Sequence, residues 1–99
     1  MTVDVCKMRK SERQRNRELK EALAGRDEAV AWMSAGVELD DRQVEVVERF
    51  RVAYQRWGSV DRDIWYLCAT RSVTECARLL QVSRRFVDTK YKTLCREFV

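Results

Sequence analysis

Between residues 83 and 92 the chain carries a cluster of polar side chains rich in hydrogen-bond donors. The adjacent guanidinium groups of Arg84 and Arg85 are suited to paired hydrogen bonds with guanine edges or phosphate oxygens. The candidate contact residues are Ser83, Arg84, Arg85, Asp88, Thr89 and Lys92. On a helix these positions share one face, which is the surface that a DNA major groove would meet. The alternative interpretation is that these residues form an ordinary solvated helix face. A charge cluster without further context would favour that interpretation.

Apolar residues around this cluster predict two short helices joined by a tight turn. In the first helix, 73–80, the inward positions are Val73, Cys76, Ala77 and Leu80. In the second helix, 84–98, the stripe is Val87, Tyr91, Leu94 and Phe98, at spacings of i, i+4, i+7 and i+11. Ala77 is small, as is required where two helix backbones cross closely. The segment 72–98 is therefore expected to form a helix-turn-helix motif.

Glycines and capping residues divide the rest of the chain into further helices. The sequence has no proline, and its three glycines each follow a helical pattern: Gly25, Gly36 and Gly58. Ser11, Asp40 and Ser72 each precede a glutamine or glutamate by three residues, which is the spacing of a capping box. The predicted fold is all-α, with about five to six helices at 11–24, 27–35, 41–57, 61–70, 73–80 and 84–98.

The predicted core lies where aromatic residues recur at helical spacing. Helix 41–57 has a wide apolar face, formed by Val44, Val46, Val47, Phe50, Ala53, Tyr54 and Trp57. We interpret Trp32, Trp57 and Trp65 as core or interface groups. Helix 11–24 has only a narrow apolar stripe, so we expect a solvent-facing arm, a partner-docking helix or a basic segment that orders on nucleic acid.

The formal charge of +4 is unevenly distributed along the 99 residues. Residues 1–26 carry 8 basic and 4 acidic groups, and residues 67–99 carry 7 and 3, whereas residues 27–66 carry 5 and 9. A polyanionic partner should therefore meet the two ends of the chain. We divide the chain into a basic N-terminal arm with short helices at 1–36, available for dimerisation or nucleic-acid contact, and a helical core at 37–99.

Several other classes of protein are not expected. The four cysteines lack the paired spacing of a zinc site and the chain has no histidine, so we expect buried thiols in a reducing cytoplasm and no metal. No apolar run is long enough for a membrane span, and no signal peptide is visible. Without a histidine, a glycine-rich phosphate loop or a cysteine placed beside a base, neither an enzyme nor a cofactor is expected.

The segment from Val60 to Phe98 resembles the four-helix DNA-binding domain of sigma-70 region 4 and of LuxR-type regulators. A helix resembling the one that precedes the motif in those families contains Arg62, Asp63, Ile64, Trp65 and Leu67. The motif itself is matched by Ser72, Glu75, Cys76, Ala77, Leu80, Val82, Ser83 and Val87, followed by Tyr91, Leu94 and Phe98. Two positions depart from the pattern. Gln81 replaces the glycine common in the turn, so it would have to tolerate positive φ, and Lys90 replaces an aliphatic residue.

The resemblance implies roles for the polar cluster. It makes 73–80 the supporting helix and 84–98 the recognition helix, with Arg84 and Arg85 at the end that reaches base edges or flanking phosphates. Asp88 would accept from a cytosine amino group or orient an arginine, and Ser83 would cap the helix and touch a phosphate.

The expected function is that of a small stand-alone bacterial or phage transcription regulator. It would bind double-stranded DNA in a sequence-specific way, as a homodimer. The alternative is an interaction module with the same fold that binds RNA polymerase or another regulator, as an activator, antiterminator or inhibitor.

Overall fold

The chain folds into helices throughout the part that the structure describes. The computed structural model describes the backbone of residues 2–35 and 39–99, and the side chains from residue 12 onward within those ranges. The helices are α1 (Thr2–Leu23), α2 (Arg26–Ser34), α3 (Asp41–Arg56), α4 (Ser59–Thr70), α5 (Val73–Leu80) and α6 (Arg84–Arg96). No strand occurs within these ranges, so the predicted all-α class is confirmed.

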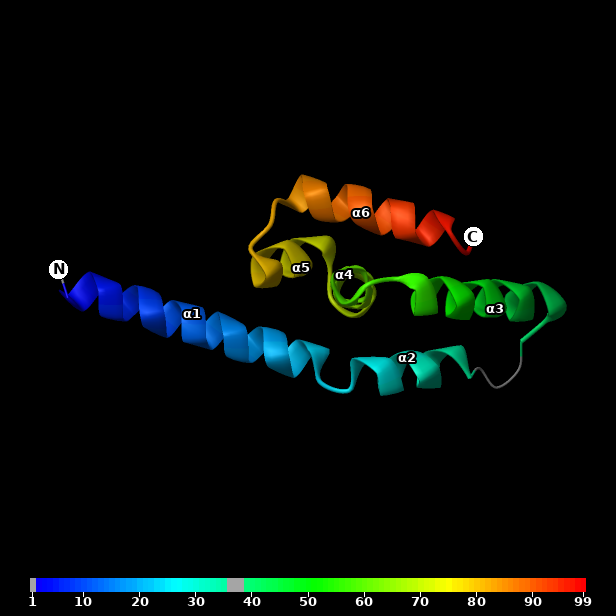
Figure 1. Cartoon of the computed structure of the whole chain (residues 1–99), viewed down its shortest axis with the longest axis horizontal. Coiled ribbons are helices and arrows are strands. Elements are labelled where there is room, and N and C mark those ends of the chain that lie inside the picture. Colours follow the sequence, from blue (N-terminus) through cyan, green and yellow to red (C-terminus); the bar gives the residue numbers. More distant parts are fainter. Residues whose placement is uncertain (1, 36–38) are drawn as a thin grey trace.

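Helix α4 lies at the centre of the arrangement. It contacts α5 and α6 on one side and α1 and α2 on the other, and α5 also contacts α1. In Figure 1, α4 is seen end-on, with α6 above it and α1 and α2 below. The molecule is long, with extents of 61 × 25 × 20 Å, because α1 and α3 extend beyond this centre in opposite directions.

Aromatic side chains from α3, α4 and the C-terminus form one end of the core. The ring of Phe50 lies 4.6 Å from that of Trp65 and 5.0 Å from that of Phe98, measured between centroids. Trp57 is also buried in this cluster, and its indole nitrogen donates a hydrogen bond to the carboxylate of Glu97. Such aromatic pairs add to the free energy gained by burial alone. The prediction that Trp57 and Trp65 are core residues is therefore confirmed.

The predicted core face of α3 is correct only in its C-terminal half. Phe50, Ala53 and Tyr54 are buried, but Val44 and Val46 are exposed. The reason is geometric, because the first two turns of α3 extend past the ends of α2 and α6 (Figure 1). Apolar spacing identifies which side of a helix is apolar, but it does not show where along the helix its neighbours end.

Helix α1 differs from its prediction in two respects. It begins at Thr2, not near residue 11, so Ser11 lies inside the helix and the capping box predicted there is wrong. Neither glycine nor proline interrupts residues 2–10, and the helix continues through them. The narrow stripe at the other end is packed: Ala22 is buried, and Leu19 and Leu23 lie against the core. The last turns of α1 therefore belong to the core.

Local capping explains most of the helix boundaries. Asp40 and Gln43 form the predicted capping box at the start of α3, and the Ser72 side chain accepts from the Glu75 amide at 3.0 Å. Gly25 adopts the left-handed conformation, φ 67°, between α1 and α2. Gly58 does not, because with φ −70° it instead precedes α4 as its N-cap.

Gly36 and the division expected between residues 36 and 37 lie outside the described residues. Among the helices that the structure does describe, none has the length and apolar character needed to cross a bilayer.

Candidate nucleic-acid interface

The turn between α5 and α6 contains one residue in the left-handed conformation. Gln81 is left-handed, with φ 55° and ψ 45°, as the sequence comparison with a glycine-containing turn predicts. The Val82 amide then donates to the Ala77 carbonyl at 3.1 Å, which closes α5. Ser83 begins the next helix, since its hydroxyl accepts from the Phe86 amide at 3.1 Å. Three consecutive residues thus end one helix, reverse the chain and start the other.

The inward sides of α5 and α6 fix the angle between them. Val87 and Cys76 are fully buried, and Ala77 and Leu94 are nearly so. The expectation for α5 needs one correction: Leu79 is buried, whereas Leu80 and Val73 are only partly buried. Helix α5 contacts α1 as well as α4 and α6, so it is enclosed more widely than local periodicity predicts, and Leu79 is buried. Because α5 is itself closely packed, the buried contacts between α5 and α6 hold α6 in one orientation.

The polar face of α6 is left open to solvent. Ser83, Arg84, Arg85, Thr89 and Lys92 are exposed and Asp88 is half-buried. All six candidate residues therefore lie together on the outward side of the first turns of α6. Within this group, the Lys92 ammonium lies 3.0 Å from the Asp88 carboxylate, one turn away. Arg84 and Arg85 project from the N-terminal turn, where the helix dipole also favours an anion.

Two neighbouring residues have roles that the sequence left open. Lys90 is half-buried at the edge of the motif and pairs with Asp61 of α4 at 3.3 Å, so α6 is tied to α4 by charge where other motifs use an aliphatic residue. Phe86 is 49% exposed beside the two arginines. An aromatic ring at this position is available for apolar contact with a thymine methyl group.

Behind the polar face, three thiols lie among the helices of the motif. Cys76 is buried and Cys68 and Cys95 are half-buried, all with free thiols. A hydrogen bond between Cys68 and Cys76 lowers the pKa of Cys76 and, together with burial, raises that of Cys68. Burial raises the pKa of the Cys95 thiol. Cys68 and Cys95 therefore stay protonated at neutral pH, in agreement with the expected packing role.

Polar contacts tie α1 to the motif, and these were not foreseen. Arg78 of α5 lies 2.8 Å from the Glu18 carboxylate of α1 and 2.9 Å from that of Glu75. Gln81 accepts a hydrogen bond at 3.1 Å from Nη2 of Arg15, in the amide orientation that satisfies both groups. The Arg78–Glu18 pair and the Arg15–Gln81 contact each join residues at least 60 positions apart in the chain. No local spacing rule identifies such partners.

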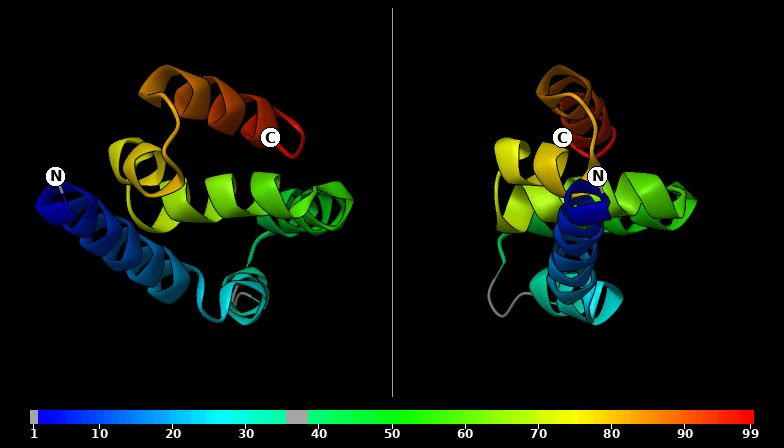
Figure 2. Two further views of the ribbon diagram at one scale, coloured as in Figure 1. Left: turned by 60° about the vertical axis from the view of Figure 1, so that its left-hand side comes forward. Right: turned by 90° about the vertical axis from the view of Figure 1, so that its left-hand side faces the viewer.

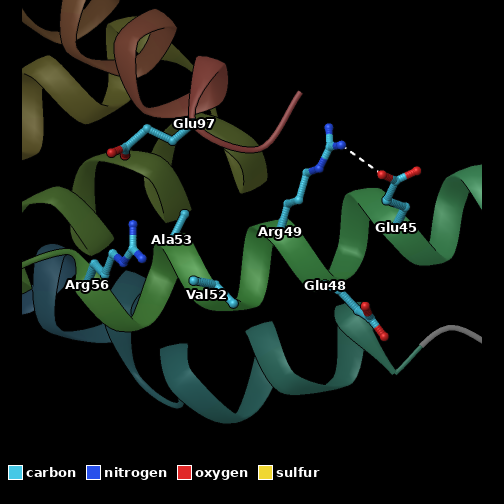
Figure 3. A pocket seen from close by; sticks show the side chains of 7 residues that line it. All are labelled: Glu45, Glu48, Arg49, Val52, Ala53, Arg56 and Glu97. Atoms are coloured by element: carbon cyan, nitrogen blue, oxygen red, sulfur yellow. Dashed lines mark hydrogen bonds and ion pairs between the residues drawn. The ribbon is translucent and has the colours of Figure 1, made fainter.

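The surface also carries a shallow groove along α3, bordered by Glu97 after the end of α6 and away from the polar residues at the start of α6. It is lined by Glu45, Glu48, Arg49, Val52, Ala53, Arg56 and Glu97. Figure 3 shows both carboxylates and guanidinium groups along it, with Arg49 paired to Glu45 at 2.7 Å. A mixture of both charge signs is typical of a solvated helix face. Its charges largely balance, so it offers a polyanion less than the α6 face does.

Other kinds of site are not apparent where side chains are described. In residues 12–35 and 39–99, no group of three or more histidine, cysteine, aspartate or glutamate side chains is placed to hold a metal ion. The α6 face is thus the strongest candidate interface on geometric grounds. In comparisons with known proteins, no family model matches the chain, and no curated protein or solved structure is similar to it.

Proposed function

We propose that the protein is a sequence-specific double-stranded DNA-binding regulator of transcription that inserts α6 into the major groove. One observation carries the proposal: a helix whose inner side is fixed by buried Val87 and Leu94 presents six polar residues outward, directly after a tight turn. The buried inner side fixes the angle of α6, and the tight turn fixes where the helix begins. A helix that reads bases needs both, because base recognition requires a fixed orientation.

In this proposal the six polar residues have different roles. Arg84 and Arg85 contact guanine edges or the phosphates that flank them, and a bidentate arginine–guanine pair is worth about 1–3 kcal/mol of discrimination. Ser83 and Thr89 add phosphate or base contacts from the same face. Asp88, already paired with Lys92, orients the lysine or accepts from a cytosine amino group. Phosphate contacts supply affinity, and base contacts supply specificity.

Selection from a random pool of duplexes tests this proposal. The full chain should enrich a shared sequence of a few base pairs, or two copies of it. Two copies spaced by about 10 base pairs would also support the expected homodimer. The double variant Arg84→Gln/Arg85→Gln should fold normally, since both side chains are exposed, and should enrich no sequence. If the wild-type protein enriches nothing, or if the variant enriches the same sequence, the proposal is wrong.

A second candidate function rests on an exposed apolar surface of α2. Trp32 is 83% exposed and Met33 is 55% exposed. Aromatic and methionine side chains are enriched at protein–protein interfaces, so their exposure on α2 indicates a surface that a partner would cover. The prediction of a core or interface role for Trp32 therefore reduces to an interface role. A regulator of this kind would bind RNA polymerase or another regulator through α2.

The two functions are separated by purified components. If Trp32→Ala abolishes binding to purified RNA polymerase while the wild-type protein has no affinity for duplex DNA, the interaction module is favoured. Duplex binding that is independent of Trp32 favours the DNA reader.

A further inference from the structure

We propose that the N-terminal part of α1, residues 2–17, is a second DNA-contacting element, which binds phosphates beside the groove occupied by α6. The inference rests on the proposed function and extends its site from one helix to two. It assigns a role to the projecting part of α1, which lies outside the core. The partner is the phosphate backbone of the same duplex, identified by charge and position.

The first observation is the direction in which α1 projects. Figure 1 shows that α1 passes below α5 and that its N-terminal end projects beyond the α5–α6 turn and the start of α6 along the long axis of the molecule. The two further views in Figure 2 agree with this placement. From Thr2 to Glu12 the helix extends about 16 Å, at about 1.5 Å per residue. That length exceeds the width of a major groove, about 12 Å, so α1 is long enough to reach a phosphate ridge beside it.

The second observation is the charge of this N-terminal part of the helix. Residues 2–17 contain six basic and two acidic residues, which gives a net charge of +4. Within the part whose side chains are described, Arg13 and Arg17 are exposed one helical turn apart. The next acidic residue, Glu18, is neutralised by Arg78. The charge is therefore concentrated on the part of α1 that leaves the core, where a core-packing role does not require it.

The third observation is that α1 is held in a fixed position relative to the motif. Glu18 binds Arg78 of the supporting helix, and Arg15 binds Gln81 in the turn itself. Ala22 is buried nearby, which anchors the following turn. A flexible basic tail would contact phosphates wherever it met them, whereas a tied helix contacts them at a set distance from the bases read by α6. The contacts of α1 should therefore strengthen binding without changing the sequence preference.

The salt dependence of duplex binding tests the inference. Fluorescence anisotropy would compare the wild type with Arg13→Gln/Arg17→Gln on a selected and an unselected duplex. Loss of two phosphate contacts should reduce the slope of log K against log salt by about 2, and at 0.1 M salt should weaken both complexes by about 10- to 100-fold. The matched control is Arg42→Gln/Arg49→Gln. It makes the same change in charge on the half of α3 at the opposite end of the molecule and should change the slope much less.

The outcomes separate this inference from the proposed function. If Arg13→Gln/Arg17→Gln keeps the wild-type slope while Arg84→Gln/Arg85→Gln loses sequence preference, α1 is not a DNA contact and the proposed function stands. An equal fall in slope for the α3 control would also overturn the inference, because the effect would then follow net charge alone. If α1 instead joins two copies of the chain, Arg13→Gln/Arg17→Gln would change the molar mass of the free protein measured by light scattering. The slope of log K against log salt, per copy bound, would then stay at its wild-type value, and the inference would be overturned. Absence of duplex binding by the wild type would overturn the proposed function itself.

Discussion

The left-handed conformation of Gln81 leads to a prediction that separates backbone strain from side-chain contact. An L-residue in this conformation costs about 1–2 kcal/mol, which glycine does not pay. Glycine in turn lowers the free energy of unfolding by about 0.4–1 kcal/mol, because it gives the unfolded chain more conformational freedom. Gln81→Ala keeps the strain and loses the hydrogen bond to Arg15, whereas Gln81→Gly loses the bond but relieves the strain. We therefore expect the glycine variant to be more stable than the alanine variant by about 1 kcal/mol.

Urea unfolding followed by tryptophan fluorescence measures this difference, because Trp57 and Trp65 are buried. For a domain of this size, a difference of about 1 kcal/mol corresponds to roughly 4–8 °C in Tm. The comparison between the two variants cancels the loss of the Arg15 bond, which is absent from both. An alanine variant as stable as the glycine variant would show that Gln81 is not held in the left-handed conformation. The account of the turn would then be wrong.

Three further predictions concern the core, the pH response and the surface. Val87→Ala should lower the free energy of unfolding by about 2 kcal/mol, because the side chain is fully buried between α6 and its supports; a loss below half of that in urea would contradict the packing. Burial, together with a hydrogen bond to Asp27, raises the pKa of Tyr54 to about 12, so stability that is complete below about pH 10 should fall as the pH rises from 10 toward 12. Tyr54→Phe should fall less over that interval, and equal pH profiles of unfolding would contradict the assigned pKa. Trp32→Ala should change stability by less than about 0.5 kcal/mol in the same assay, and a larger loss would place Trp32 in the core.

The segment that forms α5, the following turn and α6 was the part of the fold most accessible from sequence. Its boundaries, the cap at Ser83 and the left-handed Gln81 all follow from interactions within a few residues. The stripe of α6 was predicted correctly because Val87 and Leu94 recur at helical spacing. Local rules are sufficient where the determining contacts are themselves local.

The predictions failed where distant segments decide burial. Leu79 is buried on a helix that contacts α1, α4 and α6, and Val44 is exposed because α3 projects beyond its neighbours; neither arrangement follows from the nearby sequence. The same holds for the ties from Arg15 and Glu18 to the motif, which join the two ends of the chain. The six candidate residues were placed on one exposed face as expected, but whether that face binds DNA remains a prediction.

The most direct test of the central claim is chemical protection of the major groove. Dimethyl sulfate methylates guanine at N7, the atom that a bidentate arginine occupies. With a selected duplex saturated by the full chain, we expect guanines in the shared sequence to be protected. The protection should disappear for Arg84→Gln/Arg85→Gln at a concentration that still saturates the duplex. If saturated complexes of wild type and variant leave the same guanines equally reactive, α6 does not read the major groove through these arginines, and the central claim is contradicted.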